Sequence, residues 1–178
     1  ADVRRLFDET EQKLGKVDVL INNAGILQIA ALADTSDELF ERTFSINVRG
    51  TFNTLREAAT RLNDGGRVVN FSSSTVAMSL PNYSVYAGSK AAVEVLTPIF
   101  AKEMRGRSIT VNAVAPGPVA TDLFFNGKTE AQIQQLANMP PLQRLGQPDD
   151  IAAAVSFLVG PDGGWINGQV LRANGGLA

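Results

Sequence analysis

The sequence of 178 residues contains no cysteine and no histidine. Without cysteine the chain can form no disulfide and has no thiol chemistry. Without either residue it also lacks the usual nitrogen and sulfur ligands of metal sites. We therefore expect no metal centre, and any chemistry must come from other side chains or from an organic cofactor.

Positive charge is limited as well, because 16 lysines and arginines stand against 18 acidic residues and leave a net charge of -2. This balance leaves no basic patch for nucleic acid. The best uncharged stretch, residues 151–160, is too short to span a bilayer. We predict no nucleic acid and no membrane as partner, and we expect a cytoplasmic protein. With 44% hydrophobic residues and no linker or repeat, residues 1–178 are expected to form one domain.

Helix-like and strand-like segments alternate along the chain. Apolar residues at helical spacing, together with capping patterns, predict helices over residues 2–14, from Thr35-Ser36-Asp37-Glu38 to about 62, over 83–104, a short one from Thr129-x-x-Gln132, and one from about 148. Short apolar runs predict strands over residues 17–21, 67–71, 109–115 and 168–172. Such alternation favours a doubly wound α/β fold with parallel strands joined by helical crossovers. Pro98 is expected to make the third helix irregular.

The strongest chemical pattern is Tyr86-Ala87-Gly88-Ser89-Lys90, which places a phenol and an ammonium one helical turn apart on one face. A free tyrosine titrates near pH ~10, and we expect the lysine cation to favour the phenolate and lower the tyrosine pKa. A tyrosine with such a pKa can protonate an alkoxide that forms on a ketone. By itself, a Tyr-x-x-x-Lys spacing is weak support for this chemistry.

Other motifs fall where ligands of open parallel sheets bind. Ser73 directly follows the predicted strand over residues 67–71, at its carboxyl end. Taken alone, Asn22-Asn23-Ala24-Gly25 is compatible with a simple turn, Asn47 with a solvated helix residue, and Pro116-Gly117-Pro118 with a loop. Their order and spacing along the chain argue against these three unrelated explanations.

Read in order, these motifs resemble the active site of the short-chain dehydrogenase/reductase family, and the resemblance covers nearly all of the chain. It implies a Rossmann-like sheet and hydride transfer between a nicotinamide cofactor and a small ketone or secondary alcohol. It also implies that Tyr86 is the general acid and base, that Lys90 lowers its pKa, and that Ser73 orients the carbonyl. Asn47 would hold a water that links Lys90 to solvent.

The resemblance further implies which residues contact the ligands. The cofactor contacts would be Asn22, Ala24, Gly25, Tyr86, Lys90, Pro116, Gly117, Val119 and Thr121. After Thr121 the chain resembles the mobile substrate segment of the family, where apolar surface is offered by Leu123, Phe124, Phe125 and Met139. Ordinary core packing explains any one of these four equally well. NADP(H) is favoured over NAD(H) by the habit of family reductases alone.

The glycine-rich turn that opens a dinucleotide-binding sheet has no counterpart before residue 22, so we expect the first βαβαβ portion to be incomplete in this chain. Three alternatives stay open: a 3-oxoacyl-carrier-protein reductase, an isomerase or lyase, and a non-catalytic oligomeric subunit. Arg107 matches one of two arginines that bind the acidic carrier, but Asp64 stands at the other position with opposite charge, which favours a free substrate. The resemblance also implies a homotetramer or homodimer.

Overall fold

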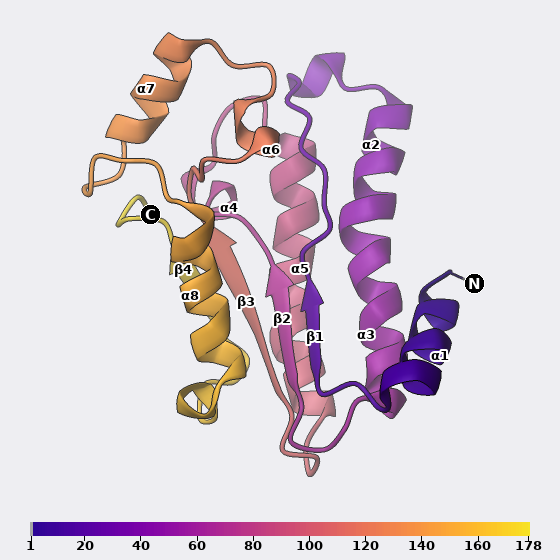
Figure 1. Ribbon diagram of the computed structural model, residues 1–178. Coiled ribbons are helices and arrows are strands. Elements are labelled where there is room, and N and C mark those ends of the chain that lie inside the picture. The colour runs from indigo at the N-terminus through magenta and orange to yellow at the C-terminus, as the bar shows by residue number, and fades with distance from the viewer. Residues whose placement is uncertain (1) are drawn as a thin grey trace.

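The computed structural model describes residues 2–178 and contains a parallel four-stranded sheet in the order β1-β2-β3-β4 (Figure 1). The strands are β1 (Val19–Asn22), β2 (Arg67–Phe71), β3 (Thr110–Pro116) and β4 (Val170–Ala173). The predicted α/β architecture with parallel strands is confirmed. The strand ends shift only slightly from their predicted positions, which is where sequence patterns are least informative.

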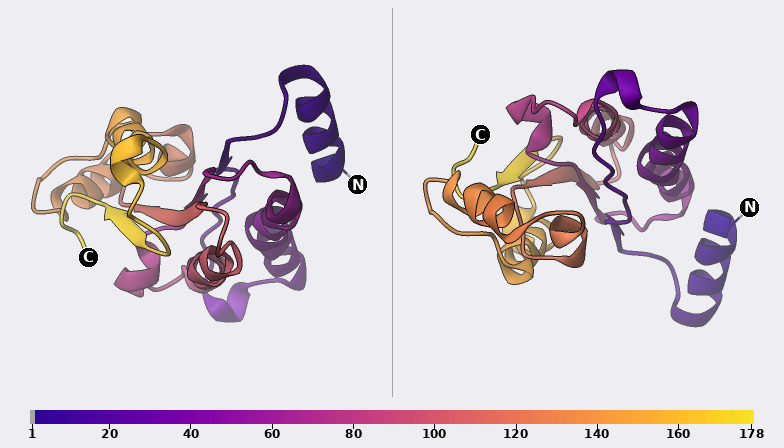
Figure 2. Two further views of the ribbon diagram at one scale, coloured as in Figure 1. Left: turned by 90° about the horizontal axis from the view of Figure 1, so that it is seen from below. Right: turned by 90° about the horizontal axis from the view of Figure 1, so that it is seen from above.

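Helices cover both faces of this sheet (Figure 2). On one side α3 (Gly50–Arg61) and α5 (Ser84–Glu103) pack on the strands, and α1 (Asp2–Leu14) packs on α3. On the other side α8 (Pro148–Val159) covers β2, β3 and β4. The result is a three-layer arrangement in which the carboxyl ends of all four strands point to the same edge.

Each side of the sheet has its own hydrophobic core. Val68 and Val69 are successive residues of β2 and are each 1% exposed, yet they belong to different cores because side chains alternate along a strand. The larger core comprises Phe7, Leu55, Ala58, Leu62, Val68, Phe100, Ala101, Met104, Ile109 and Val111. The smaller core comprises Val69, Val114, Ile151, Val155 and Leu158.

Strand β1 differs from the central strands because it lies at the edge of the sheet. Its residues Val19 and Ile21 are 41% and 44% exposed, whereas β2 and β3 are almost wholly buried. Parallel sheets are ordinarily covered on both faces. Within residues 2–178 no strand precedes β1, and its apolar side chains are therefore partly open to solvent.

The long helix predicted to end near residue 62 is divided in the structure. It consists of α2 (Asp37–Phe44), the π-helical turn η2 (Ser45–Arg49) and α3. The predicted cap is also one residue off, because the Ser36 hydroxyl, not that of Thr35, accepts the hydrogen bond from the Leu39 amide. The wider turn carries Asn47 toward the sheet, and single π turns of this kind often occur at functional sites. No proline or glycine pattern in the sequence predicts this π-helical turn.

The remaining elements follow the sequence more closely. Helix α5 continues unbroken through Pro98, so the irregularity expected there does not end the helix. The short helices are α4 (Thr75–Met78), α6 (Asp122–Phe125) and α7 (Glu130–Asn138). Thr129 and Gln132 form the capping box that begins α7, as their spacing predicted. We call residues 121–139, which contain α6 and α7, the lid, because they lie beyond the strand ends (Figure 1).

A chain of polar side chains crosses the middle of the fold. Asn70 is fully buried on β2, where its Oδ1 accepts a hydrogen bond from Asn22 Nδ2 at 2.8 Å and its Nδ2 donates to Thr97 Oγ1 at 3.0 Å. Asn22 Oδ1 accepts from Thr54 Oγ1 at 2.7 Å. These bonds connect α3, β1, β2 and α5 and hold the strand ends beneath the site.

We expect Asn70→Ala to lower the free energy of unfolding by about 2 kcal/mol, because it leaves buried donors and acceptors of its neighbours without partners. Urea unfolding of the purified protein measures this change. Asn138→Ala, in an exposed position of α7, is the matched control and is expected to have little effect. Equal stability of the two variants would show that Asn70 is not part of a stabilising network.

Candidate active site

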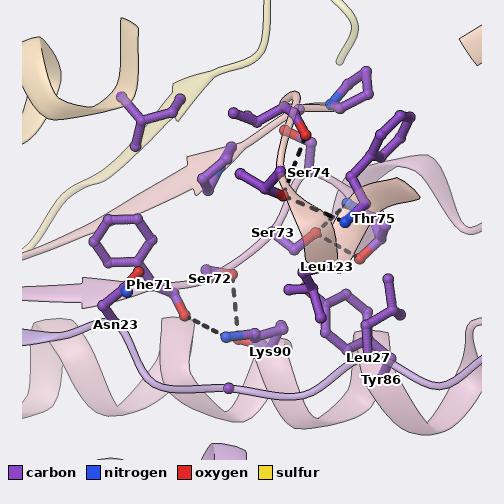
Figure 3. Close-up of a pocket in the computed structure, with 18 of the residues that line it drawn as sticks. Asn23, Leu27, Phe71, Ser72, Ser73, Ser74, Thr75, Tyr86, Lys90 and Leu123 are labelled. Carbon is purple, nitrogen blue, oxygen red and sulfur yellow. Dashed lines mark hydrogen bonds between the residues drawn. The ribbon is translucent and has the colours of Figure 1, made fainter. Parts of the chain in front are cut away.

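A cavity of about 650 Å³ lies at the carboxyl ends of the strands, the position where open parallel sheets bind ligands (Figure 3). Its walls come from the loop after β1, the ends of β2 and β3, the start of α5, the lid, and the face of α8 that turns toward the sheet. Its size falls within the range of small-molecule and cofactor sites.

Tyr86 and Lys90 occupy the wall formed by α5, and both are largely buried, with 9% and 5% exposure. The Lys90 ammonium donates a hydrogen bond to the backbone oxygen of Phe71 at 2.8 Å and lies 5.9 Å from the centre of the Tyr86 ring. Burial lowers the pKa of Lys90 to about 8. One of its three ammonium donors is thus used by the strand end, and the others can serve a ligand.

The three serines after β2 have different partners. Ser72 donates to Glu94 at 2.8 Å and Ser74 donates to the backbone oxygen of Ala115 at 3.0 Å. The Ser73 hydroxyl instead lies beside Tyr86, where it acts to lower the pKa of the phenol. The structure therefore brings together Ser73, Tyr86 and Lys90, the three residues that the sequence pattern grouped (Figure 3).

Thr75 was not singled out from the sequence, but it contacts Ser73 directly. Its hydroxyl donates to Ser73 Oγ at 2.9 Å and its backbone amide donates to the same oxygen at 3.3 Å. With both lone pairs of Ser73 Oγ engaged, the serine hydrogen is left to donate toward the cavity. The contact depends on the turn into α4, which has no distinctive sequence pattern.

The expected direction of the Tyr86 pKa is wrong for this structure. Burial is the largest effect and raises the pKa of Tyr86, while the nearby Ser73 hydroxyl acts in the opposite direction. Residue spacing reveals the nearby cation but not the cost of burying a charged phenolate. Tyr86 is consequently well suited to hold a proton at neutral pH.

Asn47 lies behind the cavity wall and is 1% exposed. Its Oδ1 accepts from the Ile26 amide at 2.9 Å, and its Nδ2 donates to the Ile26 oxygen and to Ser89 Oγ, both at 3.0 Å. A Cβ atom at Gly25 would lie 3.2 Å from Asn47 Oδ1 and 3.3 Å from Lys90 Nζ. Asn47 thus fixes the loop after β1 against α5, and its role in a water relay stays a prediction.

The residues predicted for the cofactor divide into two groups. Gly25, Pro116, Gly117, Val119 and Thr121 line the cavity together with Tyr86 and Lys90. Asn22 and Ala24 are not among the lining residues, and the Asn22 side chain is committed to Asn70 and Thr54. Asn23 lines the cavity in their place, which the sequence argument did not anticipate because it could not assign the direction of each side chain in the turn.

Three of the four predicted substrate residues, Leu123, Phe124 and Met139, line the cavity. Phe125 does not; its ring is 40% exposed and packs edge-on against Phe124. Sequence reasoning missed further lining residues, because they come from segments that only the fold brings together. They include Leu27, Met78, Leu80, Tyr83, Lys128, Leu136 and Leu177.

The lining residues fit a nicotinamide ribose. The absence of a side chain at Gly25 lets the loop after β1 pass beside Lys90, whose ammonium is buried and has a single hydrogen-bond partner within the described residues. Ribose hydroxyls can accept from the remaining ammonium donors. Among residues 2–178 there is no group of three acidic side chains that could hold a metal ion, and no helix is long and apolar enough to cross a membrane.

Comparisons with known proteins show the family to which the chain belongs. The family model described as Enoyl-(Acyl carrier protein) reductase matches residues 1–178. The chain is 48% identical over 180 residues to a short-chain type dehydrogenase/reductase of Picea abies, covering 99% of this chain and 66% of that protein. It is 44% identical over 181 residues to an NADPH-dependent aldehyde reductase-like chloroplastic protein of Arabidopsis thaliana, covering 99% and 67%.

Solved structures give the same result. A blue fluorescent protein from a metagenomic library, in complex with NADPH, has a TM-score of 0.93 and 36% identity, covering 99% of this chain and 71% of that one. The angucycline C-6 ketoreductase LanV with bound NADP has a TM-score of 0.90 and 30% identity, covering 98% and 68%. The chain belongs to the short-chain dehydrogenase/reductase family, whose members are NAD(P)-dependent oxidoreductases. It spans about two thirds of the length of the curated relatives that it matches.

Proposed function

We propose that the protein is an NADP(H)-dependent reductase of small aldehydes or ketones, which also oxidises the corresponding secondary or primary alcohols. The observation that carries this proposal is the cluster of Ser73, Tyr86 and Lys90 on one wall of a largely apolar cavity. When bound, the nicotinamide supplies or accepts the hydride. The residues of this chain must then position the carbonyl and transfer one proton.

Each residue of the cluster has a separate task. Ser73 donates a hydrogen bond to the carbonyl oxygen and holds it beside Tyr86. Tyr86 delivers its phenolic proton to that oxygen as negative charge develops, so that the C=O bond becomes C–OH and the tyrosine becomes a phenolate. Lys90 stabilises the phenolate and binds the ribose, and Asn47 supports the route by which Tyr86 regains a proton.

The preference for NADP(H) is supported by relatives and by solved structures. The Arabidopsis relative is called NADPH-dependent, and two of the similar structures contain NADPH or NADP. The choice between NADPH and NADH is measured directly by comparing kcat/KM for the two cofactors.

The substrate is proposed to be free and not bound to a carrier protein. Arg107, which matches a carrier-docking arginine, pairs with Asp64 at 2.7 Å. It also donates hydrogen bonds to the backbone oxygens of Ala59 and Leu62. A guanidinium held in this way fixes the end of α3 and has little capacity left for an acidic partner. Comparable turnover of a carrier-bound oxoacyl group would contradict this proposal.

The other interpretations receive less support. A non-catalytic subunit has no need for the catalytic cluster, which is assembled here, and no feature of the cavity favours isomerisation or elimination. A homodimer or homotetramer remains a proposal, supported by the exposed apolar side chains Phe52, Val95 and Ile99 on α3 and α5. The cytoplasmic location also stays a prediction, since two of the relatives are named chloroplastic.

The direct test is NADPH consumption by the purified full-length protein with a panel of aldehydes and ketones. We expect reduction of aromatic or aliphatic aldehydes, with the alcohol formed in equal amount to the NADPH consumed. Ser73→Ala is expected to lose about a hundredfold in kcat/KM, because the carbonyl is no longer held beside Tyr86. Failure of the protein both to bind NADPH and to consume it with any carbonyl compound would refute the proposed function.

A further inference from the structure

The charged side chains that line the cavity are all cationic. Of the residues 2–178, Lys90 and Lys128 are the charged residues that line it, and neither aspartate nor glutamate does so. The chain as a whole carries slightly more acidic than basic residues, so this is a local property of the cavity. Lys90 already has a place in the proposed reaction. Lys128 has none.

Lys128 lies on the lid between α6 and α7. Four of the other lid residues that line the cavity are apolar, namely Leu123, Phe124, Leu136 and Met139. Its ammonium donates a hydrogen bond to the backbone oxygen of Phe124 at 2.6 Å and stands 4.9 Å from the centre of the Phe124 ring. Both contacts orient the lysine along the lid, and neither carries a full negative charge. None of the ion pairs in the described part of the chain involves Lys128.

No acidic side chain of the described residues therefore neutralises the charge of Lys128. Partial burial lowers the pKa of Lys128, which shows that its surroundings penalise the charged form. Two ammonium donors remain after the bond to Phe124. An anionic group in the cavity would accept these donors and offset the cost of burial, whereas a neutral apolar substrate would increase it.

We propose that Lys128 binds a carboxylate on the substrate, so that the preferred substrates are oxo acids in which an aldehyde or ketone and a carboxylate are joined by an apolar body. This inference rests on the proposed reductase function. Leu123, Phe124 and Met139 would contact the apolar body, while Ser73 and Tyr86 hold the carbonyl. A phosphate of the cofactor is the other anion that could reach a cationic lid, and the experiment separates the two.

The test compares para-carboxybenzaldehyde with its methyl ester, which has the same ring and aldehyde without the charge. We expect wild-type kcat/KM to be at least about tenfold higher for the acid, and Lys128→Met to lose about tenfold to a hundredfold for the acid but little for the ester. Lys128→Arg keeps the charge and should retain most of the preference. Lys102→Met, an exposed lysine on α5 outside the cavity, is the matched control.

Two binding measurements accompany the kinetics in the full-length protein. The dissociation constant of para-(hydroxymethyl)benzoate is expected to rise about tenfold or more in Lys128→Met, while that of NADPH stays unchanged. If Lys128→Met binds NADPH more weakly and loses equal kcat/KM for the acid and the ester, Lys128 binds a cofactor phosphate and the proposal is overturned. Equal wild-type rates for acid and ester would overturn it and leave the reductase function standing. Absence of reduction for every aldehyde would refute both.

Discussion

Replacing Tyr86 with phenylalanine is expected to lower kcat/KM for carbonyl reduction by about a thousandfold while the dissociation constant of NADPH changes little. The substitution removes one hydroxyl and keeps the ring, so α5 and the cavity wall should remain in place. The loss follows because phenylalanine has no proton to deliver to the carbonyl oxygen that Ser73 holds. Steady-state kinetics and a fluorescence titration with NADPH measure the two effects.

Tyr83→Phe is the matched control for this experiment. Tyr83 also lines the cavity, and its ring packs edge-on against Tyr86 with centroids 6.4 Å apart. The variant therefore removes a neighbouring phenol from the same part of α5 and its preceding turn. We expect no comparable loss of rate. Substantial residual activity in Tyr86→Phe, or an equal loss in Tyr83→Phe, would show that Tyr86 is not the proton donor.

Replacing Lys90 with methionine is expected to lower kcat/KM by about a hundredfold or more and to change its pH dependence. Burial lowers the pKa of Lys90 to about 8, so its ammonium is charged below that pH and neutral above it. Because the cation stabilises the phenolate formed by proton transfer, the wild-type rate of reduction should be level below pH 8 and fall above it. The profile of kcat/KM against pH measures this.

The direction of this pH dependence distinguishes titration of Lys90 from titration of Tyr86. The pKa of Tyr86 is raised, so the phenol keeps its proton through the range in which Lys90 loses its charge. Lys90→Met should consequently lack the decline near pH 8, and Lys102→Met should reproduce the wild-type profile. A decline that persists in Lys90→Met would mean that another group titrates. The fold should survive this substitution, because burial already disfavours the charged form of Lys90.

Local sequence patterns predicted those parts of the fold that depend on neighbours in the chain. The apolar spacing of α1, the capping box of Thr129 and Gln132, and the β-branched runs of β2 and β3 all lead to the elements that form. The π-helical turn at Ser45–Arg49 was missed, because it arises where Asn47 bonds to the Ile26 backbone and to Ser89, both distant in sequence.

The same distinction between local and long-range interactions applies to the candidate site. Spacing on one helix was enough to pair Tyr86 with Lys90, because residues four apart share a face whatever the rest of the fold does. The choice of Ser73 over Ser72 came from a resemblance, and the structure supplies a physical reason, because Ser72 bonds to Glu94 whereas Ser73 lies beside Tyr86. Asn22 and Phe125 were placed in the site from sequence, but their side chains belong elsewhere.

The sequence by itself determined the family, the parallel α/β architecture and the identity of the residues that could perform acid–base chemistry. Only the tertiary structure decided how these residues are tuned and what surrounds them. Burial depends on segments that meet across the sheet, and burial raises the pKa of Tyr86 and lowers the pKa of Lys90. The same long-range packing places Lys128 in the cavity wall, since the lid lines one cavity with the loop after β1 and the end of β2, which are distant in sequence.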